Sequence, residues 1–221
     1  MVSERRSTVV VNEPNGKRDE FMTPEERTEK FNSQTDRLYA GLGRFVVNFE
    51  ELVAAMRQVI SMHVGNVPGP YHIRQQQVAH IFTADLTADP LARTFRSILM
   101  LAFKSYEHQE QLPAAEKLLS NLCSRIDNIN KKRNTFLHGT WHINYASEDQ
   151  QDFSLAKGFK ATNTAKGLRL DHLEHSAESF LEAAQECIVL RDLVQGFGLG
   201  LLTDIDLLKN FGFKDSKMVR I

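Results

Sequence analysis

The sequence predicts a mainly all-α protein: an antiparallel helical bundle with a small β-hairpin inserted before its last long helix. Two observations lead to this prediction. Apolar residues recur at alternating spacings of three and four along most of the chain, the period of helices with one buried face. Residues 139–170 break that period with short, strand-like apolar runs around polar turns.

The first long helix is expected to begin at Thr23, where Pro24 and Glu26 complete a helix-start signal. Its apolar track predicts either one helix or two collinear helices hinged at Gly41–Gly43. Residues 1–22 before it are polar and predict a flexible tail. The track is Phe31, Leu38, Leu42, Phe45, Phe49, Leu52, Met56 and Val59.

Three further helices are expected within the same domain, residues 23–221. A short one covers Ile73 to Ile81, another restarts at Asp89-Pro90, and a third opens at Pro113 and ends at Gly139. The last long helix follows the hairpin insertion and a capping-box pair, Asp171 and Glu174, and residues 203–221 form a C-terminal extension. Its stripe is Phe180, Ala183, Cys187, Leu190, Val194, Phe197 and Leu201.

Composition narrows the class of protein. The 221 residues are 42% hydrophobic and 25% charged, within the ordinary globular range. A formal net charge of −1 excludes a wholesale polycation, although a local basic patch stays possible. Two cysteines exclude a disulfide-rich scaffold and an all-cysteine zinc site. No apolar run approaches the roughly 20 residues that span a bilayer, so we expect a cytoplasmic protein without a membrane partner.

The most informative segment is residues 131–141. On a helical wheel Arg133 falls in the centre of the apolar stripe, between Ile129 and Phe136. A buried guanidinium requires an acidic partner, an anionic ligand or a wet crevice, because burying an unpaired charge is costly. Glu50 and Glu51 on the first long helix are the candidate acidic partners.

A polar row lies beside this stripe, formed by Asn130, Asn134 and His138 at spacings of four. His138 falls at the carboxyl end of the helix, where a positive charge is favoured. Arg133 and His138 stand about 140° apart on an ideal helix. We therefore expect either a distorted last turn at Gly139 or a site completed across a dimer.

Arg133-Asn134-x-x-x-His138 resembles the signature of the HEPN superfamily, small all-helical proteins widespread in toxin–antitoxin and anti-phage systems. The resemblance implies a homodimeric, metal-independent endoribonuclease that needs no cofactor and in which the motif helices of two protomers face each other. Arg133 would hold the scissile phosphate, and His138 would act as general acid–base in attack by the ribose 2′-hydroxyl. Asn134 would orient the histidine or the phosphate. An antitoxin or a defence-system protein is the implied partner besides RNA.

One position departs from the family. Some HEPN toxins carry a tyrosine two residues after the histidine, which a nucleotidyltransferase modifies, whereas Thr140 stands here. Two alternatives to the ribonuclease stay open. One is a catalytically inactive HEPN-like dimeric module that binds RNA, a nucleotide or a protein. The other is a helical dimerisation protein in which Arg133 forms a structural ion pair.

Basic and aromatic residues near the motif allow two interpretations each. Lys131 and Lys132 either approach RNA phosphates or form a solvated face, together with other cations of the region. Trp141 either stacks on a base or fastens the hairpin to its helix. The other cations are Arg125, Lys157, Lys160, Lys166 and Arg169.

Three other patterns predict no site. His172 and His175 have no third ligand nearby, so no metal site is expected and we interpret them as solvated residues. The glycines of residues 196–200 lack the lysine of a phosphate loop, and they indicate close helix packing or a frayed helix end. Cys123 and Cys187 lie near or on apolar stripes, as buried structural thiols do.

Overall fold

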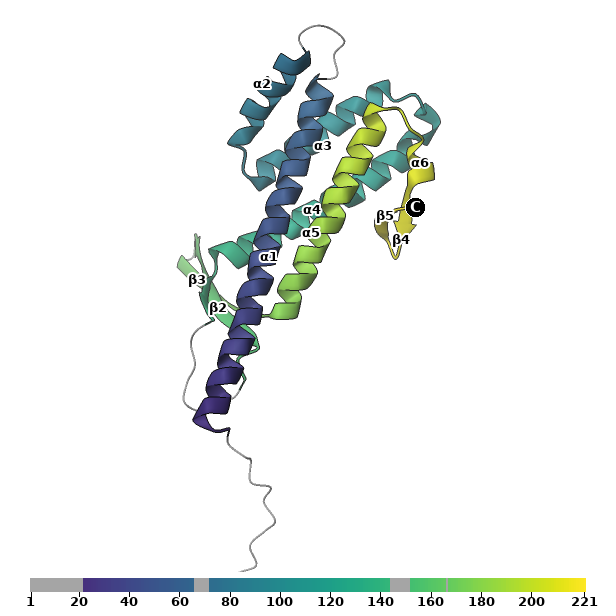
Figure 1. The fold of residues 1–221 in the computed structure, drawn as a ribbon. Coiled ribbons are helices and arrows are strands. Elements are labelled where there is room, and N and C mark those ends of the chain that lie inside the picture. The colour runs from purple at the N-terminus through teal and green to yellow at the C-terminus, as the bar shows by residue number, and fades with distance from the viewer. Residues whose placement is uncertain (1–21, 66–71, 144–151, 166) are drawn as a thin grey trace, which may run out of the picture.

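A computed structural model describes residues 22–65, 72–143, 152–165 and 167–221, and these are mainly α-helical (Figure 1). The helices are α1 (Pro24–Gly65), α2 (His72–Ala84), α3 (Ala88–Ala102), α4 (Leu112–His138), α5 (Ala177–Leu202) and α6 (Leu207–Asn210). The strands are β1 (Thr140–His142), β2 (Leu155–Thr164), β3 (Gly167–Ser176), β4 (Phe211–Lys214) and β5 (Lys217–Arg220). The predicted tail, apart from its last residue, lies outside the described residues.

The predicted start of α1 is confirmed in its atomic detail. The Thr23 amide donates to the Glu26 carboxylate at 2.9 Å, and the Glu26 amide donates to the Thr23 hydroxyl at 3.2 Å. The helix then continues through Gly41 without a hinge. Gly41 lies where α5 approaches, since an added Cβ would stand 3.1 Å from the Ala177 carbonyl oxygen. The glycine therefore serves packing, and the single-helix alternative holds.

The packing of α1 against α5 is parallel, contrary to the antiparallel order predicted. Arg37 pairs with Glu178 near the start of both helices, at 2.9 Å. Near their ends, the His63 Nε2 atom lies 2.9 Å from the Gly198 carbonyl oxygen. Figure 1 shows both helices rising in the same direction.

The direction of α5 follows from where α4 ends. Helix α4 runs antiparallel to α1, because Phe136 packs on Phe45 while Arg133 lies over Phe49. It ends beside the first half of α1, and α5 begins there too. Helix α5 then runs along the second part of α1 in α1's own direction, from Ala177 beside Gly41 to Gly198 beside His63.

The predicted apolar stripes form the core. Fully buried side chains come from α1 (Phe45, Leu52, Met56), from α3 (Leu91, Phe95), from α4 (Leu122, Ile126) and from α5 (Phe180, Leu190, Phe197). Burial of such side chains contributes about 1.5–3 kcal/mol each and is the main stabilising term of the bundle.

The inserted hairpin is longer than predicted and belongs to a three-stranded antiparallel sheet, in the order β1-β2-β3. Asp171 and Glu174 lie on β3 instead of capping α5. The predicted range of the insertion, residues 139–170, is therefore too short, because β3 continues to Ser176. The helix cap is Ser176, whose hydroxyl accepts from the Ser179 amide at 3.3 Å. Ten paired residues of β2 and β3 outweigh a local helix-start signal. The predicted turn at residues 147–150 lies outside the described residues.

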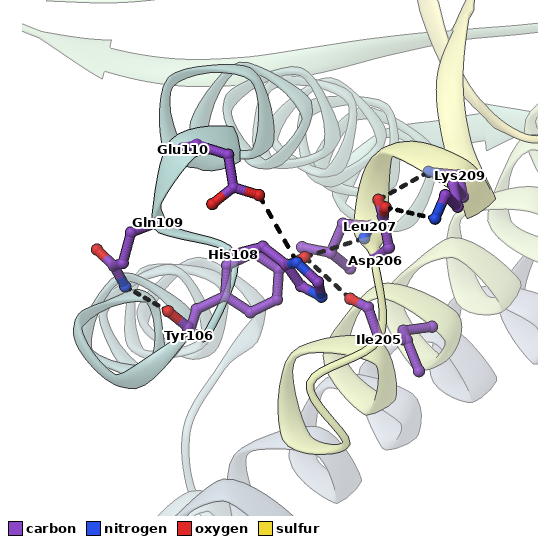
Figure 2. Close-up of polar contacts among 8 residues, drawn as sticks. All are labelled: Tyr106, His108, Gln109, Glu110, Ile205, Asp206, Leu207 and Lys209. Carbon is purple, nitrogen blue, oxygen red and sulfur yellow. Dashed lines mark hydrogen bonds and ion pairs between the residues drawn. The ribbon is translucent and has the colours of Figure 1, made fainter.

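The C-terminal extension packs onto the bundle through Tyr106 (Figure 2). The Tyr106 hydroxyl donates to the Ile205 carbonyl at 2.9 Å and accepts from the Leu207 amide at 3.0 Å. Asp206 caps α6 by accepting from the Lys209 amide at 3.1 Å. Leu207 and Met218 are fully buried, so the extension completes the same core.

Both cysteines are buried, as predicted. Burial raises the pKa of the Cys123 thiol to about 11 and that of the Cys187 thiol to about 12. Both thiols are therefore protonated at neutral pH, which does not suit a nucleophile. Among the described residues, no helix combines the length and apolarity needed to cross a membrane.

Gly198 tests the close packing of α5 on α1. An added Cβ would lie 2.4 Å from Val59 Cγ1, so Gly198→Ala should lower the free energy of unfolding by about 1–3 kcal/mol. Gly43 has no neighbour within 4 Å of an added Cβ, so Gly43→Ala should instead raise it by about 0.5–1 kcal/mol. Urea denaturation measures both. Equal effects of the two substitutions would contradict the packing.

Candidate functional site

The end of α4 is held in place by an aromatic cluster. Phe136 contacts Phe45, Phe180 and His175 edge-on, with ring centroids 4.8–5.0 Å apart. The Trp141 indole N–H donates to the Phe136 carbonyl oxygen at 2.7 Å. Trp141 therefore fastens β1 to α4, which confirms the packing interpretation of this residue. Gly139 ends the helix with extended backbone (φ −79°, ψ 145°) that leads directly into β1.

Arg133 lies in the apolar stripe as predicted, half-buried, with its guanidinium carbon 5.9 Å from the centre of the Phe49 ring. Its Nη1 atom donates to Asn134 Oδ1 at 3.3 Å and lies 3.1 Å from His138 Nε2. Its Nε atom is buried without a hydrogen-bond partner. The site therefore offers one cation with hydrogen-bonding capacity to spare.

No carboxylate of the described residues lies within 4.0 Å of the Arg133 guanidinium. Glu50 is exposed on α1 and does not take the role of acidic partner predicted for it. The neighbouring Glu51 pairs with Arg191 on α5. Within the part of the chain that the structure describes, no structural ion pair accounts for Arg133.

Arg133 and His138 meet within one protomer without the distorted last turn that was predicted for such a contact. Helix α4 remains helical through His138, and the Gly139 amide still donates to the Thr135 carbonyl at 3.1 Å. The angle of 140° describes only the directions of the Cα–Cβ bonds. The guanidinium stands at the end of a long flexible arm and spans that angle.

The contact with Arg133 fixes which ring nitrogen of His138 bears the lone pair. A guanidinium has five N–H donors and no acceptor, so Nε2 of His138 must accept. The neutral ring then carries its proton on Nδ1. An exposed imidazole with a lone pair at Nε2 has the arrangement that a general base requires.

Asn130 is the site residue to which the sequence assigned no role beyond the polar row. It is only 2% exposed, and neither its amide nitrogen nor its amide oxygen has a hydrogen-bond partner. Such atoms are rare in folded proteins because each costs about 1–3 kcal/mol. Asn130 and Arg133 Nε lie within one turn of α4, so three of the five unsatisfied side-chain atoms among the described residues lie at the motif. The only sequence feature that pointed to Asn130 was its spacing of four residues from Asn134.

The two lysines before the motif lie on different sides of α4. Both are exposed, but helix geometry places Lys131 within about 20° of His138. Lys132 lies near His175 and Cys187, on whose side chains it acts electrostatically. Only Lys131 shares the side of the polar row with His138.

The remaining predicted cations do not form one free patch. Arg125 pairs with Glu186 at 2.7 Å and donates to the Met218 carbonyl at 2.8 Å. Arg169 pairs with Asp171 at 2.9 Å, and Lys166 lies outside the described residues. Arg125 therefore fastens the last strand to the bundle, whereas Arg169 belongs to an exposed surface pair. Lys157 and Lys160 lie on β2, so Lys131 is the lysine that helix geometry places beside His138.

Four hollows on the described surface lie away from the motif. Hollows of about 260 to 650 Å³ occur at the start of α1, at the far end of α1 and α5, and beside the β4–β5 hairpin. The motif side chains line none of these four.

His172 and His175 do not act as a ligand pair, since residues three apart on a strand point to opposite faces. His172 is exposed, but His175 is half-buried against Phe136, Trp141 and Phe180, so the solvated interpretation is wrong for His175. Within the described part of the chain, no group of three His, Cys, Asp or Glu side chains is placed to hold a metal ion.

Comparisons with family models, with curated proteins and with solved structures found no match for this chain. Function is therefore argued from the site itself. The site offers a guanidinium with unsatisfied donors, an imidazole lone pair in contact with it, and a buried amide that has no partner.

Burial of His175 predicts a pH dependence of stability. Burial lowers its pKa below the ordinary value, and nearby Lys132 lowers it further. The unfolded chain then binds this proton more readily, so the free energy of unfolding falls as the pH drops below about 6.5. His175→Phe keeps the ring contacts and should shrink the loss between pH 7.5 and pH 5.5, measured by urea denaturation. The half-buried His63, whose pKa burial also lowers, accounts for part of the remaining loss.

The matched control is His172→Phe, because that ring lies exposed on the opposite face of the sheet. This variant should keep the wild-type pH dependence. If His175→Phe loses as much stability on acidification as the wild type, the assignment to His175 is wrong.

Proposed function

We propose that this protein is a metal-independent endoribonuclease of the HEPN type, acting in anti-phage defence or toxin–antitoxin growth control. The observation that carries the proposal is the contact of Arg133 with His138, at a place where no carboxylate of the described residues pairs with Arg133. A cation beside an imidazole lone pair suits the cleavage of an RNA phosphodiester.

Arg133 binds the scissile phosphate in this proposal. Its fork of N–H donors matches the geometry of phosphate oxygens, and no carboxylate of the described residues competes for it. Asn134 accepts from the guanidinium and holds it in orientation. As charge develops on the phosphate oxygens, the half-buried guanidinium stabilises it more strongly than an exposed cation does.

His138 acts as the general base. When the phosphate takes over the Arg133 donor, the Nε2 lone pair is released and accepts the proton of the ribose 2′-hydroxyl. The 2′-oxygen then bonds to phosphorus and the bond to the 5′-oxygen breaks, which leaves a 2′,3′-cyclic phosphate. The departing 5′-oxygen takes up a proton from water.

Lys131 attracts the neighbouring phosphates from the His138 side of α4. Lys132 and Trp141 have smaller parts, since Lys132 lies on another side of α4 than His138 and the Trp141 indole N–H donates to the Phe136 carbonyl. A homodimer through the motif helices would bring two such surfaces together and give an RNA strand a shared path. An antitoxin or defence-system protein that covers this surface would silence it.

The test is RNA cleavage in EDTA by the wild type and by Arg133→Ala/His138→Ala. Wild-type cleavage should persist in EDTA and leave a 2′,3′-cyclic phosphate, and the double variant should lose it by about 10²–10⁴-fold or more. Arg93→Ala/His80→Ala is the matched control, because it removes the same residue types from exposed positions on α2 and α3. The control should cleave at the wild-type rate.

Equal cleavage by the wild type and the motif variant would overturn the proposal. No cleavage by either protein, together with RNA binding that the motif variant loses, would favour the catalytically inactive binding module. Lys131→Ala and Lys132→Ala separate the two lysines, since only the first should weaken RNA binding by more than about threefold.

A further inference from the structure

Helix α2 turns its polar side toward the protein. Ala79 and Thr83 are its buried residues, and the Ser61 hydroxyl of α1 donates to the Gln76 carbonyl at 3.1 Å. Gln75 Oε1 is buried on the same side without a partner. Small and polar side chains on the inner face give α2 little apolar contact with α1.

The apolar side of α2 faces solvent. Val78 is 46% exposed, Ile81 70% and Phe82 75%. Figure 1 shows α2 at the periphery of the molecule, beside α1. Exposed apolar side chains that lie together on one helix face mark an interaction surface, whereas single ones are ordinary. We call the face formed by Arg74, Val78, Ile81, Phe82 and Asp85 the outer face of α2.

The outer face has the spacing of a helix–helix seam. Arg74, Val78, Ile81 and Asp85 follow one another at intervals of four, three and four, and Phe82 flanks them within a total arc of about 100°. Such a seam pairs with another helix.

The charges at the two ends of the seam are opposed to the dipole of α2. Arg74 lies in the first turn, where the helix favours an anion, and Asp85 directly follows the last residue, where it favours a cation. Neither has an ion-pair partner within 4.0 Å among the described residues. Arg57 donates to the Thr83 and Ala84 carbonyls at this end but does not reach the carboxylate of Asp85.

The face is complementary to itself. In an antiparallel pair of α2 helices centred between Val78 and Ile81, Val78 of each copy faces Ile81 of the other. Arg74 then faces Asp85 at both ends, because the two residues stand about 16 Å apart along the helix and symmetrically about the centre. The second copy thus brings to each end of α2 the charge that its dipole favours.

We propose that α2 is a homotypic interface, at which the outer faces of two copies of this chain pair antiparallel. The interface is separate from the motif. Helix α2 packs on α1 around Arg57 and Ser61, whereas Arg133 lies over Phe49, about 18 Å from Ser61 along the axis of α1. Pairing through α2 therefore leaves the RNA-binding surface free and does not depend on the proposed activity.

Charge reversal tests the pairing. Sedimentation equilibrium should show that Arg74→Glu and Asp85→Arg each weaken the self-association constant by about tenfold or more, because each places like charges together. The combined variant restores opposite charges in the reversed order and should return to within about threefold of the wild type. Arg93→Glu is the control. It makes the same charge reversal at an exposed position of α3 and should associate as the wild type does.

The proposal is overturned if the wild type is monomeric, if the single reversals leave association unchanged, or if the combined variant stays as weak as the single ones. Helical content by circular dichroism should not change, since both positions face solvent. RNA cleavage by the same variants should equal that of the wild type. A failure of the proposed α2 pairing can therefore be told apart from a failure of the proposed ribonuclease activity.

Discussion

The structure depends on the aromatic contact between Phe136 on α4, Phe45 on α1 and Phe180 on α5. Edge-to-face ring pairs contribute about 0.5–1.5 kcal/mol each beyond the area they bury. This contact fixes the end of α4 in a groove between two parallel helices. The three-stranded sheet packs on the same contact, because His175 touches the Phe136 ring and the Trp141 indole donates to the Phe136 carbonyl. The residues before and after Phe136 are thereby held at a defined place on the surface.

The positions of Arg133 and Asn130 lower the free energy of unfolding, because both side chains bury polar atoms without hydrogen-bond partners. The guanidinium lies half-buried over Phe49 with an unpartnered Nε, and Asn130 is buried without any hydrogen bond. Either residue could be replaced by an apolar one with a gain in folding free energy. Polar groups kept in a stripe at such a cost are typical of a site that binds something polar, and for Arg133 that ligand is an anion. Helix α2 is a second place where stability is given up, because its solvent-exposed face carries apolar residues where polar ones would suit a monomer better.

Local sequence signals predicted most of the helices correctly. Where these predictions were wrong, tertiary contacts had overridden the local signal. The capping box of Thr23 and Glu26 and the apolar stripe around Ile126 depend on nearby residues, and both were predicted correctly. Asp171 and Glu174 carry the same local signal as Thr23 and Glu26, yet cross-strand pairing with β2 overrides it. The parallel order of α1 and α5 has no local signal at all. At the site, periodicity located Arg133 and His138, but the reach of the arginine arm and the burial of Asn130 required three-dimensional packing.

The central claim is that Arg133 donates to Nε2 of His138, so that this atom accepts a proton once a phosphate takes over the arginine donor. Nitrogen-15 spectra of the histidine rings, recorded above the titration range and assigned with His138→Gln, measure this most directly. The account predicts that His138 carries its proton on Nδ1, and that inorganic phosphate shifts the Nε2 resonance in the wild type but not in Arg133→Ala. A proton found on Nε2, or a phosphate response that persists without Arg133, would contradict it.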